Sequence, residues 1–374
     1  MKVSPQKTSN GKVRPIVTAR VPVSRVEWID IGRGLMIFIM LTTHSWKSIP
    51  ELHDWGMTHL PYYFQRFTNG FVAWTGLILV VLSHRIFATR NHWRYCLSRG
   101  GRLILLSVLL HLFMVQSPKK MANLVSFTGN PDYWWIDYLA IGNSWGFYQF
   151  LVRIGMFLLV APLLLPGKDR FPWRALTFIP VVIGIVHWID WNLALDTKES
   201  FYLYKRFTHT SRTLIAGSLG VVFGWLYQKY KGNLIGRPWI GLSLFIGGIL
   251  LTEVNRYLYL SGQHGRNEVW FTVNWSICII SLLGFAHFLE YSTLSTAKRL
   301  FKLLGKYAFM IFVIHLPILG WVAPLYAQVG EGPYGGLIYF AITFSTISLG
   351  CCIVIWIRRR LPLLDVALRQ EVGI

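Results

Sequence analysis

Three polar residues with chemical potential lie in an otherwise apolar stretch near the start of the chain. Arg33 and His44 bound the sequence RGLMIFIMLTTH, and Asp30 precedes Arg33 by three positions. In a helix, a spacing of eleven residues returns to nearly the same face, so Arg33 and His44 would lie roughly 16 Å apart along one stripe, with Asp30 on the same stripe. Polar residues within a membrane span usually face the bundle interior, so this stripe is a candidate functional site.

The residue types on this stripe indicate different roles. Histidine is the usual general base near neutral pH, whereas the arginine side chain binds carboxylate or phosphate. One helix would thus present an anion-binding group near one membrane surface and a base deeper in the membrane, as a reaction with an anionic donor requires. A structural alternative is that Arg33 reaches the lipid headgroups and His44 makes an ordinary hydrogen bond. Two such residues on one face, beside Asp30, favour function.

Arg99 and Arg102 form a second candidate group, in the sequence SRGGRL, which we expect in a cytoplasmic loop at a helix start. The intervening glycines allow the backbone to approach a ligand closely, and arginines three positions apart can hold phosphates together. The same charges also fit the ordinary excess of basic residues in cytoplasmic loops.

His315 is a further candidate, at mid-depth in a late apolar segment and two positions before Pro317. The weaker candidates, some of which we expect to pair with one another, are Arg153, His187, Glu253, His287 and Glu290. The four cysteines show no metal-ligand spacing, and motifs typical of nucleophilic hydrolases or zinc helices are lacking, so no metal is expected.

Long apolar segments must position these residues. The chain of 374 residues is 53% hydrophobic and 14% charged, against about 25% charged in soluble domains. This composition predicts a polytopic membrane protein. The ten candidate spans are Trp28–Trp46, Phe71–Ile86, Arg102–Val115, Phe147–Leu165, Ala175–Trp191, Thr213–Gln228, Trp239–Leu258, Trp270–Glu290, Tyr307–Ala323 and Gly336–Ile357.

The distribution of the 37 lysines and arginines supports this topology. They concentrate in alternate connecting segments, beginning with the N-terminal tail, which predicts that both termini are cytoplasmic. The net charge of +21 then follows from topology, and no nucleic-acid partner is needed. We predict an all-α integral membrane protein with about ten transmembrane helices. A basic tail would cover residues 1–26, the membrane domain 27–358 and a C-terminal tail 359–374.

The sequence resembles the integral-membrane acyltransferase-3 superfamily. That superfamily begins with a span of the form D-x-x-R-G-(apolar)-H, here DIGRGLMIFIMLTTH, and its next span commonly carries F-x-x-S-G. In the corresponding sequence FVAWTG, Thr75 replaces the serine and Gly76 is the motif glycine, with one extra residue in the spacing. The R-x-x-R of the family matches Arg99 and Arg102, and the late motif ending in H-x-P-I matches His315.

Within the superfamily, RGGRLILLSVLLHLF and GFYQFLVRIGMFLLVAPLLL look closer to the OpgC-like branch, which succinylates periplasmic glucans. The resemblance implies a multi-pass protein of the bacterial inner membrane. It would transfer an acyl group from cytoplasmic acyl-CoA, either acetyl-CoA or succinyl-CoA, to a hydroxyl of a periplasmic or surface glycan or a lipid-linked sugar.

The resemblance also implies roles for the matched residues. Arg33, Arg99 and Arg102 would hold the CoA phosphates. His44 would act as the base, or would carry the acyl group as a covalent acyl-histidine intermediate. Asp30 would orient Arg33 or balance its charge, and His315 would line the acceptor side or help to position His44. Thr75 and Gly76 would contact substrate.

Two other classes of function compete with this one. A transporter or flippase would use His44, His315 and Glu253 as a proton or substrate path, but the sequence shows no internal repeat of the kind many transporters have. A non-catalytic membrane scaffold would leave the alignment of Arg33 and His44 unexplained.

Overall fold

The computed structural model of the chain is helical throughout the part that it describes. That part comprises residues 26–47, 70–83, 87, 91–114, 149–167, 170–192, 198–234, 236–260, 268–315, 318, 322 and 334–360. The all-α class is therefore confirmed for these residues. Nearly all of both predicted tails lies outside them.

The labelled helices follow one another along the chain without an intervening strand in the described residues. They are α1 (Glu27–Lys47), α4 (Gly70–Val81), α6 (His92–Met114), α9 (Gln149–Leu164), α10 (Trp173–Asn192), α11 (Lys198–Leu234), α12 (Pro238–Leu260), α13 (Glu268–Tyr291), α14 (Ser295–Lys306) and α16 (Gly335–Arg360). A further helical segment covers residues 308–315.

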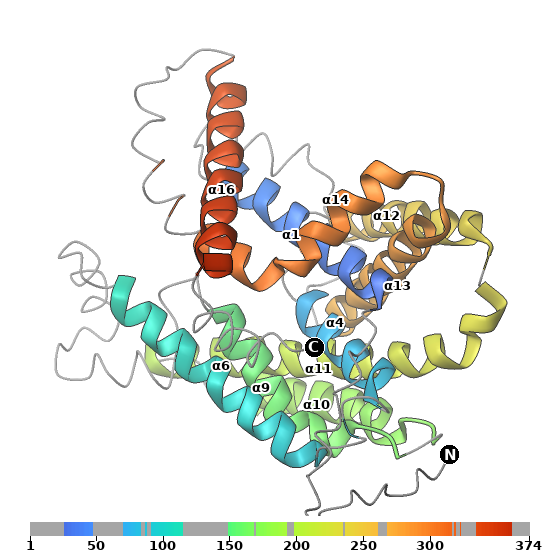
Figure 1. The fold of residues 1–374 in the computed structure, drawn as a ribbon. Helices are drawn as coiled ribbons and strands as arrows, with labels where there is room; N and C mark the ends of the chain where they lie inside the picture. Colours follow the sequence, from blue (N-terminus) through green and yellow to red (C-terminus); the bar gives the residue numbers. More distant parts are fainter. Residues whose placement is uncertain are drawn as a thin grey trace, which may run out of the picture.

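Helix α1 occupies a central place in this arrangement. Glu27 and Asp30 lie in its first turn, where carboxylates complement the positive end of the helix dipole. Its apolar residues are buried on nearly all sides, because α4, α13, α14 and α16 all pack against it. Figure 1 shows α14 crossing α1, with α16 beside them. The stripe that carries Arg33 is thus enclosed by other helices.

Close helix crossings depend on glycines, as is common where helices pack in membranes. A side chain at Gly34 would overlap the backbone carbonyl of Phe301, so α1 and α14 are nearly in backbone contact. A side chain at Gly220 would likewise overlap the carbonyl of Ala73, which brings α11 against α4. The first contact fixes α14 against α1, and the second fixes α4 against α11.

The observed helices agree with most of the predicted spans within a few residues. Three of the described helices, α10, α12 and α13, are long and apolar enough to cross a membrane, and shorter apolar helices cover Gly70–Val81, Leu151–Leu164 and Ala341–Gly350. Helix α11 differs, because it begins at Lys198 and continues through a segment that we expected to be an outer loop.

Helix α14 was not predicted, since its lysines and arginine indicated a cytoplasmic loop. It is amphipathic: Ala297, Phe301 and Leu304 pack inward, whereas Arg299 and Lys306 are exposed. The buried face lies against α1 and forms part of two hydrophobic clusters. The basic segment is therefore a structural part of the bundle.

Candidate functional site

One cavity brings together several residues that the sequence predicts for the site. It lies between α1, α4, α6, α9 and the segment 308–315, with an empty volume of about 990 Å³. Its polar lining includes Arg33, Thr75, Tyr95 and Arg99, and most of the remaining lining is aliphatic or aromatic. A mostly apolar cavity with a few convergent polar groups is typical of small-molecule sites.

Asp30 and Arg33 form an ion pair near the start of α1. Arg33 Nη2 lies 3.4 Å from Asp30 Oδ1, and Asp30 is only 1% exposed. Residues three apart on a helix are neighbours, so the pairing follows from the local sequence. A buried carboxylate without a partner would be strongly destabilising. Asp30 therefore holds the Arg33 guanidinium at the wall of the cavity.

Tyr95 holds the second arginine of the cavity. Arg99 Nη1 donates a hydrogen bond of 2.8 Å to Tyr95 Oη, and the Arg99 guanidinium carbon lies 5.7 Å from the centre of the Tyr95 ring. Tyr95 is buried and lines the cavity with Arg99. Sequence reasoning missed Tyr95, although its spacing of four residues before Arg99 on a helix was a signal for this contact.

Arg102 takes a different position from Arg99. Both arginines lie on α6, but Arg102 is exposed and does not line the cavity. The expectation that SRGGRL forms a loop is wrong, because α6 begins at His92 and runs through both arginines. Gly100, between them, faces the backbone of Gly155 on α9 and allows the two helices to pack closely.

Thr75 and Gly76 lie on different sides of α4. Thr75 lines the cavity, and its hydroxyl donates a hydrogen bond of 2.9 Å to the carbonyl of Phe71 one turn earlier. The hydroxyl oxygen can still accept a hydrogen bond from a ligand. Gly76 faces α11, where a side chain would overlap the carbonyl of Gly217. Gly76 thus allows α11 to pack behind the cavity wall.

His315 is completely buried at the end of the segment 308–315. Its Nδ1 lies 2.7 Å from the carbonyl oxygen of Phe312 and 3.2 Å from that of Ile311. A carbonyl can only accept, so the proton of this contact is on Nδ1. The Phe312 ring, 5.6 Å from the His315 ring, also lines the cavity.

His44 lies in the last turn of α1, but its side chain is outside the described residues. The helix runs without interruption from Glu27 to Lys47. Three turns therefore separate position 44 from Arg33, and the two positions lie on nearly the same face. The backbone alignment on which the sequence prediction depends is present.

The weaker candidates are scattered: Arg153 lies on α9, His187 on α10, Glu253 on α12, and His287 and Glu290 on α13. Glu253 pairs with Arg256 on its own helix, with 3.4 Å between Oε2 and Nη1. His187 is exposed, whereas His287 is buried and its ring lies 4.8 Å from that of Tyr291. None of the five lines the cavity around Arg33.

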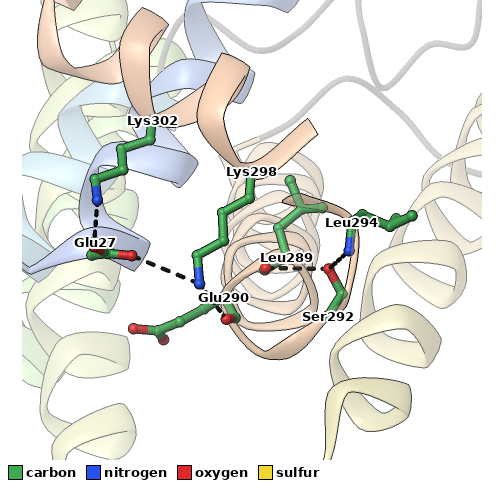
Figure 2. A network of polar contacts seen from close by, with 7 residues as sticks. All are labelled: Glu27, Leu289, Glu290, Ser292, Leu294, Lys298 and Lys302. Carbon is green, nitrogen blue, oxygen red and sulfur yellow. Dashed lines mark hydrogen bonds and ion pairs between the residues drawn. The ribbon is translucent and has the colours of Figure 1, made fainter. Parts of the chain in front are cut away.

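An ionic network joins α14 to the beginning of α1, one turn before Asp30 (Figure 2). Lys302 donates a hydrogen bond to Glu27, and Lys298 Nζ lies 3.7 Å from the second Glu27 oxygen. Lys298 also donates to the backbone carbonyl of Glu290, at 2.7 Å. The hydrogen bond from Lys302, with the charges of both lysines, lowers the pKa of the Glu27 carboxyl. This network fixes three helices at one end of the bundle.

A short turn connects α13 to α14 beside this network (Figure 2). The Ser292 hydroxyl donates to the carbonyl of Leu289, at 3.2 Å, and accepts from the backbone N–H of Leu294, at 3.4 Å. These bonds satisfy backbone groups between the two helices. They set the direction in which α14 leaves α13.

Cys96 is the thiol nearest in sequence to the arginine pair, but it is not poised as a nucleophile. It is fully buried in an apolar cluster. Burial raises its pKa to about 12, despite the opposing charge of Arg99. The protonated thiol is a weak nucleophile.

Comparison with protein families identifies the family of the chain. The family model of the acyltransferase-3 group, described as an acyltransferase domain, matches residues 26–357. No curated protein and no solved structure matches the chain. The matched region begins just before α1 and ends within α16, so it includes every residue that lines the cavity.

Proposed function

The chain belongs to the acyltransferase-3 family, and we therefore propose that it is a membrane-bound O-acyltransferase that uses acyl-CoA. It takes an acetyl or succinyl group from acyl-CoA on the cytoplasmic side. The acceptor is a hydroxyl of a periplasmic or cell-surface glycan, or of a lipid-linked sugar. Three apolar helices long enough to cross a membrane support the membrane assignment.

The observation that carries this proposal is the shared cavity of Arg33 and Arg99. The two arginines are far apart in the sequence and come from α1 and α6, yet both line one largely apolar space. CoA has phosphates at one end and a long, narrow arm that ends in the thioester. Guanidinium groups bind phosphates strongly, and the apolar walls suit the arm. Arg102, exposed further along α6, would add a phosphate contact outside the cavity.

The chemistry requires a base on the acceptor side, and we assign this role to His44. His44 removes the proton from the acceptor hydroxyl as its oxygen attacks the thioester carbonyl carbon. The new C–O bond forms, the C–S bond breaks, and the CoA sulfur takes up the proton. His315, with its Nδ1 proton held by a backbone carbonyl, lines the acceptor side and orients the acceptor.

The decisive experiment is mass spectrometry of periplasmic and surface glycans from cells with and without the gene. We expect an acyl group on the glycan only when the gene is present, and its mass distinguishes acetyl from succinyl. His44→Ala should abolish this acylation while the protein still enters the membrane. His187→Ala, which removes an exposed histidine on α10, is the matched control and should leave acylation unchanged.

Three outcomes would contradict the proposal. Identical glycans with and without the gene would exclude glycan acylation. Normal acylation by the His44→Ala variant would exclude His44 as the base. Transport of a solute without release of free CoA would instead indicate a transporter.

A further inference from the structure

A second cavity lies in a groove between α11 and α12, with α13 as its floor. It has an empty volume of about 600 Å³ and is lined mainly by apolar and aromatic side chains of these helices. Helices α11 and α12 both pack against α13, but α12 is not a close neighbour of α11. The groove is the space that this arrangement leaves. Leu283 and Gly284 lie on its floor, and Tyr230 and Leu244 lie on its two sides.

The groove opens toward lipid. Tyr230 is 48% exposed and Leu244 is 38% exposed, so the lining reaches the surface of the molecule. Leu251, two turns after Leu244 and on nearly the same face of α12, is also an exposed apolar residue, at 56%. Exposed apolar side chains on a membrane-spanning helix contact acyl chains, and α12 is one of the helices that could span. The groove is therefore continuous with the surface that faces the bilayer.

Basic residues lie at one end of the groove. Lys229 Nζ lies 5.4 Å from the centre of the Tyr230 ring and 5.0 Å from that of Trp225. Lys229 and Lys231 are exposed in the last turns of α11. No carboxylate in the described part of the chain pairs with either lysine. Their charges are therefore available to an anionic partner.

The charge distribution places this end at the cytoplasmic leaflet, because the connection between α11 and α12 is one of the predicted inside segments. Basic pockets between membrane helices on that side bind anionic lipid headgroups. Aromatic residues such as Trp225 and Tyr230 are typical of the interfacial level. The groove thus combines an apolar channel within the bilayer with cations at headgroup depth.

We propose that this groove is a binding site for an anionic phospholipid of the cytoplasmic leaflet. One acyl chain lies on α13, beside Leu283, and the phosphate lies at Lys229 and Lys231. Tyr227 lines the same groove, and its ring packs 4.5 Å from that of Trp28 at the start of α1. A bound lipid would therefore stabilise the contact between α11 and α1 as well as the position of α12.

The test uses the full chain in nanodiscs that contain phosphatidylglycerol or phosphatidylcholine. Native mass spectrometry should show phosphatidylglycerol retained in preference to phosphatidylcholine. The double variant Lys229→Gln/Lys231→Gln should bind phosphatidylglycerol about tenfold more weakly. Arg174→Gln, which removes an exposed arginine on α10, is the control for loss of charge and should retain the lipid.

A second pair of variants tests the position of the lipid acyl chain. Leu283→Trp fills the floor of the groove and should exclude the lipid, whereas Leu250→Trp adds the same bulk to the exposed face of α12 and should not. Phosphatidylglycerol with a photoreactive group on its acyl chain should crosslink to peptides that contain Leu283 or Leu244. This last measurement needs no variant. Crosslinks distributed evenly over the apolar surface, or equal retention of both lipids, would overturn the proposal.

Discussion

A side chain at Gly305 would overlap the backbone carbonyl oxygen of Asp30, so α14 lies directly against the helix turn that carries the buried ion pair. Asp30 thus makes two contacts that affect the cavity. Its carboxylate holds Arg33, and its backbone is in contact with α14. Helix α14, which lines no part of the cavity around Arg33, therefore affects where that arginine lies.

Replacement of Gly305 tests this contact. Gly305→Ala forces α14 away from α1, and overpacking of this kind costs about 1–3 kcal/mol. We expect a lower melting temperature and weaker binding of CoA. Gly101→Ala is the matched control, because a Cβ there has open space around it and alanine favours a helix. Equal melting temperatures for the two variants would show that the crossing is looser than described.

Asp30→Asn tests the ion pair itself. The substitution leaves the Arg33 guanidinium without its carboxylate, and loss of one partner of a buried pair costs about 3–5 kcal/mol. We expect lower thermal stability and loss of acylation. The double variant Asp30→Asn/Arg33→Gln removes both charges, so it should recover stability but not activity. Thermal unfolding in detergent and an acylation assay separate the two effects.

Tyr95→Phe should weaken the binding of acyl-CoA without unfolding the protein. The variant keeps the ring under Arg99 but removes the 2.8 Å hydrogen bond. Hydrogen bonds to charged groups contribute about 1.5–3 kcal/mol. We expect KM for acyl-CoA to rise about tenfold or more, with a smaller change in kcat. Tyr257→Phe, at an exposed tyrosine on α12, should change neither.

Arg99 and Arg102 should contribute unequally to CoA affinity. Arg99 lines the cavity and Arg102 is exposed, and an exposed charge interaction is weakened by solvent and salt. Arg99→Ala should therefore reduce CoA affinity more than Arg102→Ala, and the effect of Arg102→Ala should disappear at high salt. Isothermal titration of purified protein with CoA measures both, with Arg174→Ala as a control. Unchanged affinity for CoA in the double Arg99→Ala/Arg102→Ala variant would show that neither arginine binds CoA.

The Glu27 network predicts a loss of stability on the acid side. Its partners hold the pKa of Glu27 below its ordinary value, so the folded state favours the ionised carboxyl. The resulting stabilisation is fully present above the unfolded pKa and is lost as pH falls from there through the lower folded pKa. Glu27→Gln should therefore reduce the melting temperature at neutral pH. The melting temperature of this variant should also fall less steeply as the pH is lowered. Glu253→Gln, which breaks a pair within one helix, should leave that decline intact.

Part of this site could be predicted from sequence, because it depends on local spacing. Asp30 and Arg33 are neighbours in any helix, and the resemblance to a known family identified Arg99 and Thr75. Helical periodicity alone could not show that these residues meet in one cavity. That convergence depends on crossings between helices that are distant in the sequence, such as the contact of Gly220 with Ala73.

The differences from prediction have a common physical cause. Polar and basic sequences were interpreted as loops, yet α14 is helical because one face of it packs against the bundle. Helix α11 already begins at Lys198, and Thr208 and Ser211 in its first half are buried. The early start of α6 has the same origin, since Gly100 allows this helix to pack on α9 before it becomes apolar. Tyr95 was missed because the segment before Arg99 was not expected to be a helix.

The wall of the main cavity extends from Arg33 to Phe312 in the sequence. Neither the first nor the last third of the chain can therefore form it alone. If the protein were produced as two fragments divided in the connection between α10 and α11, a ligand of this cavity would bridge them. CoA should then promote reassembly of the fragments, and fragment complementation would report ligand binding without any turnover.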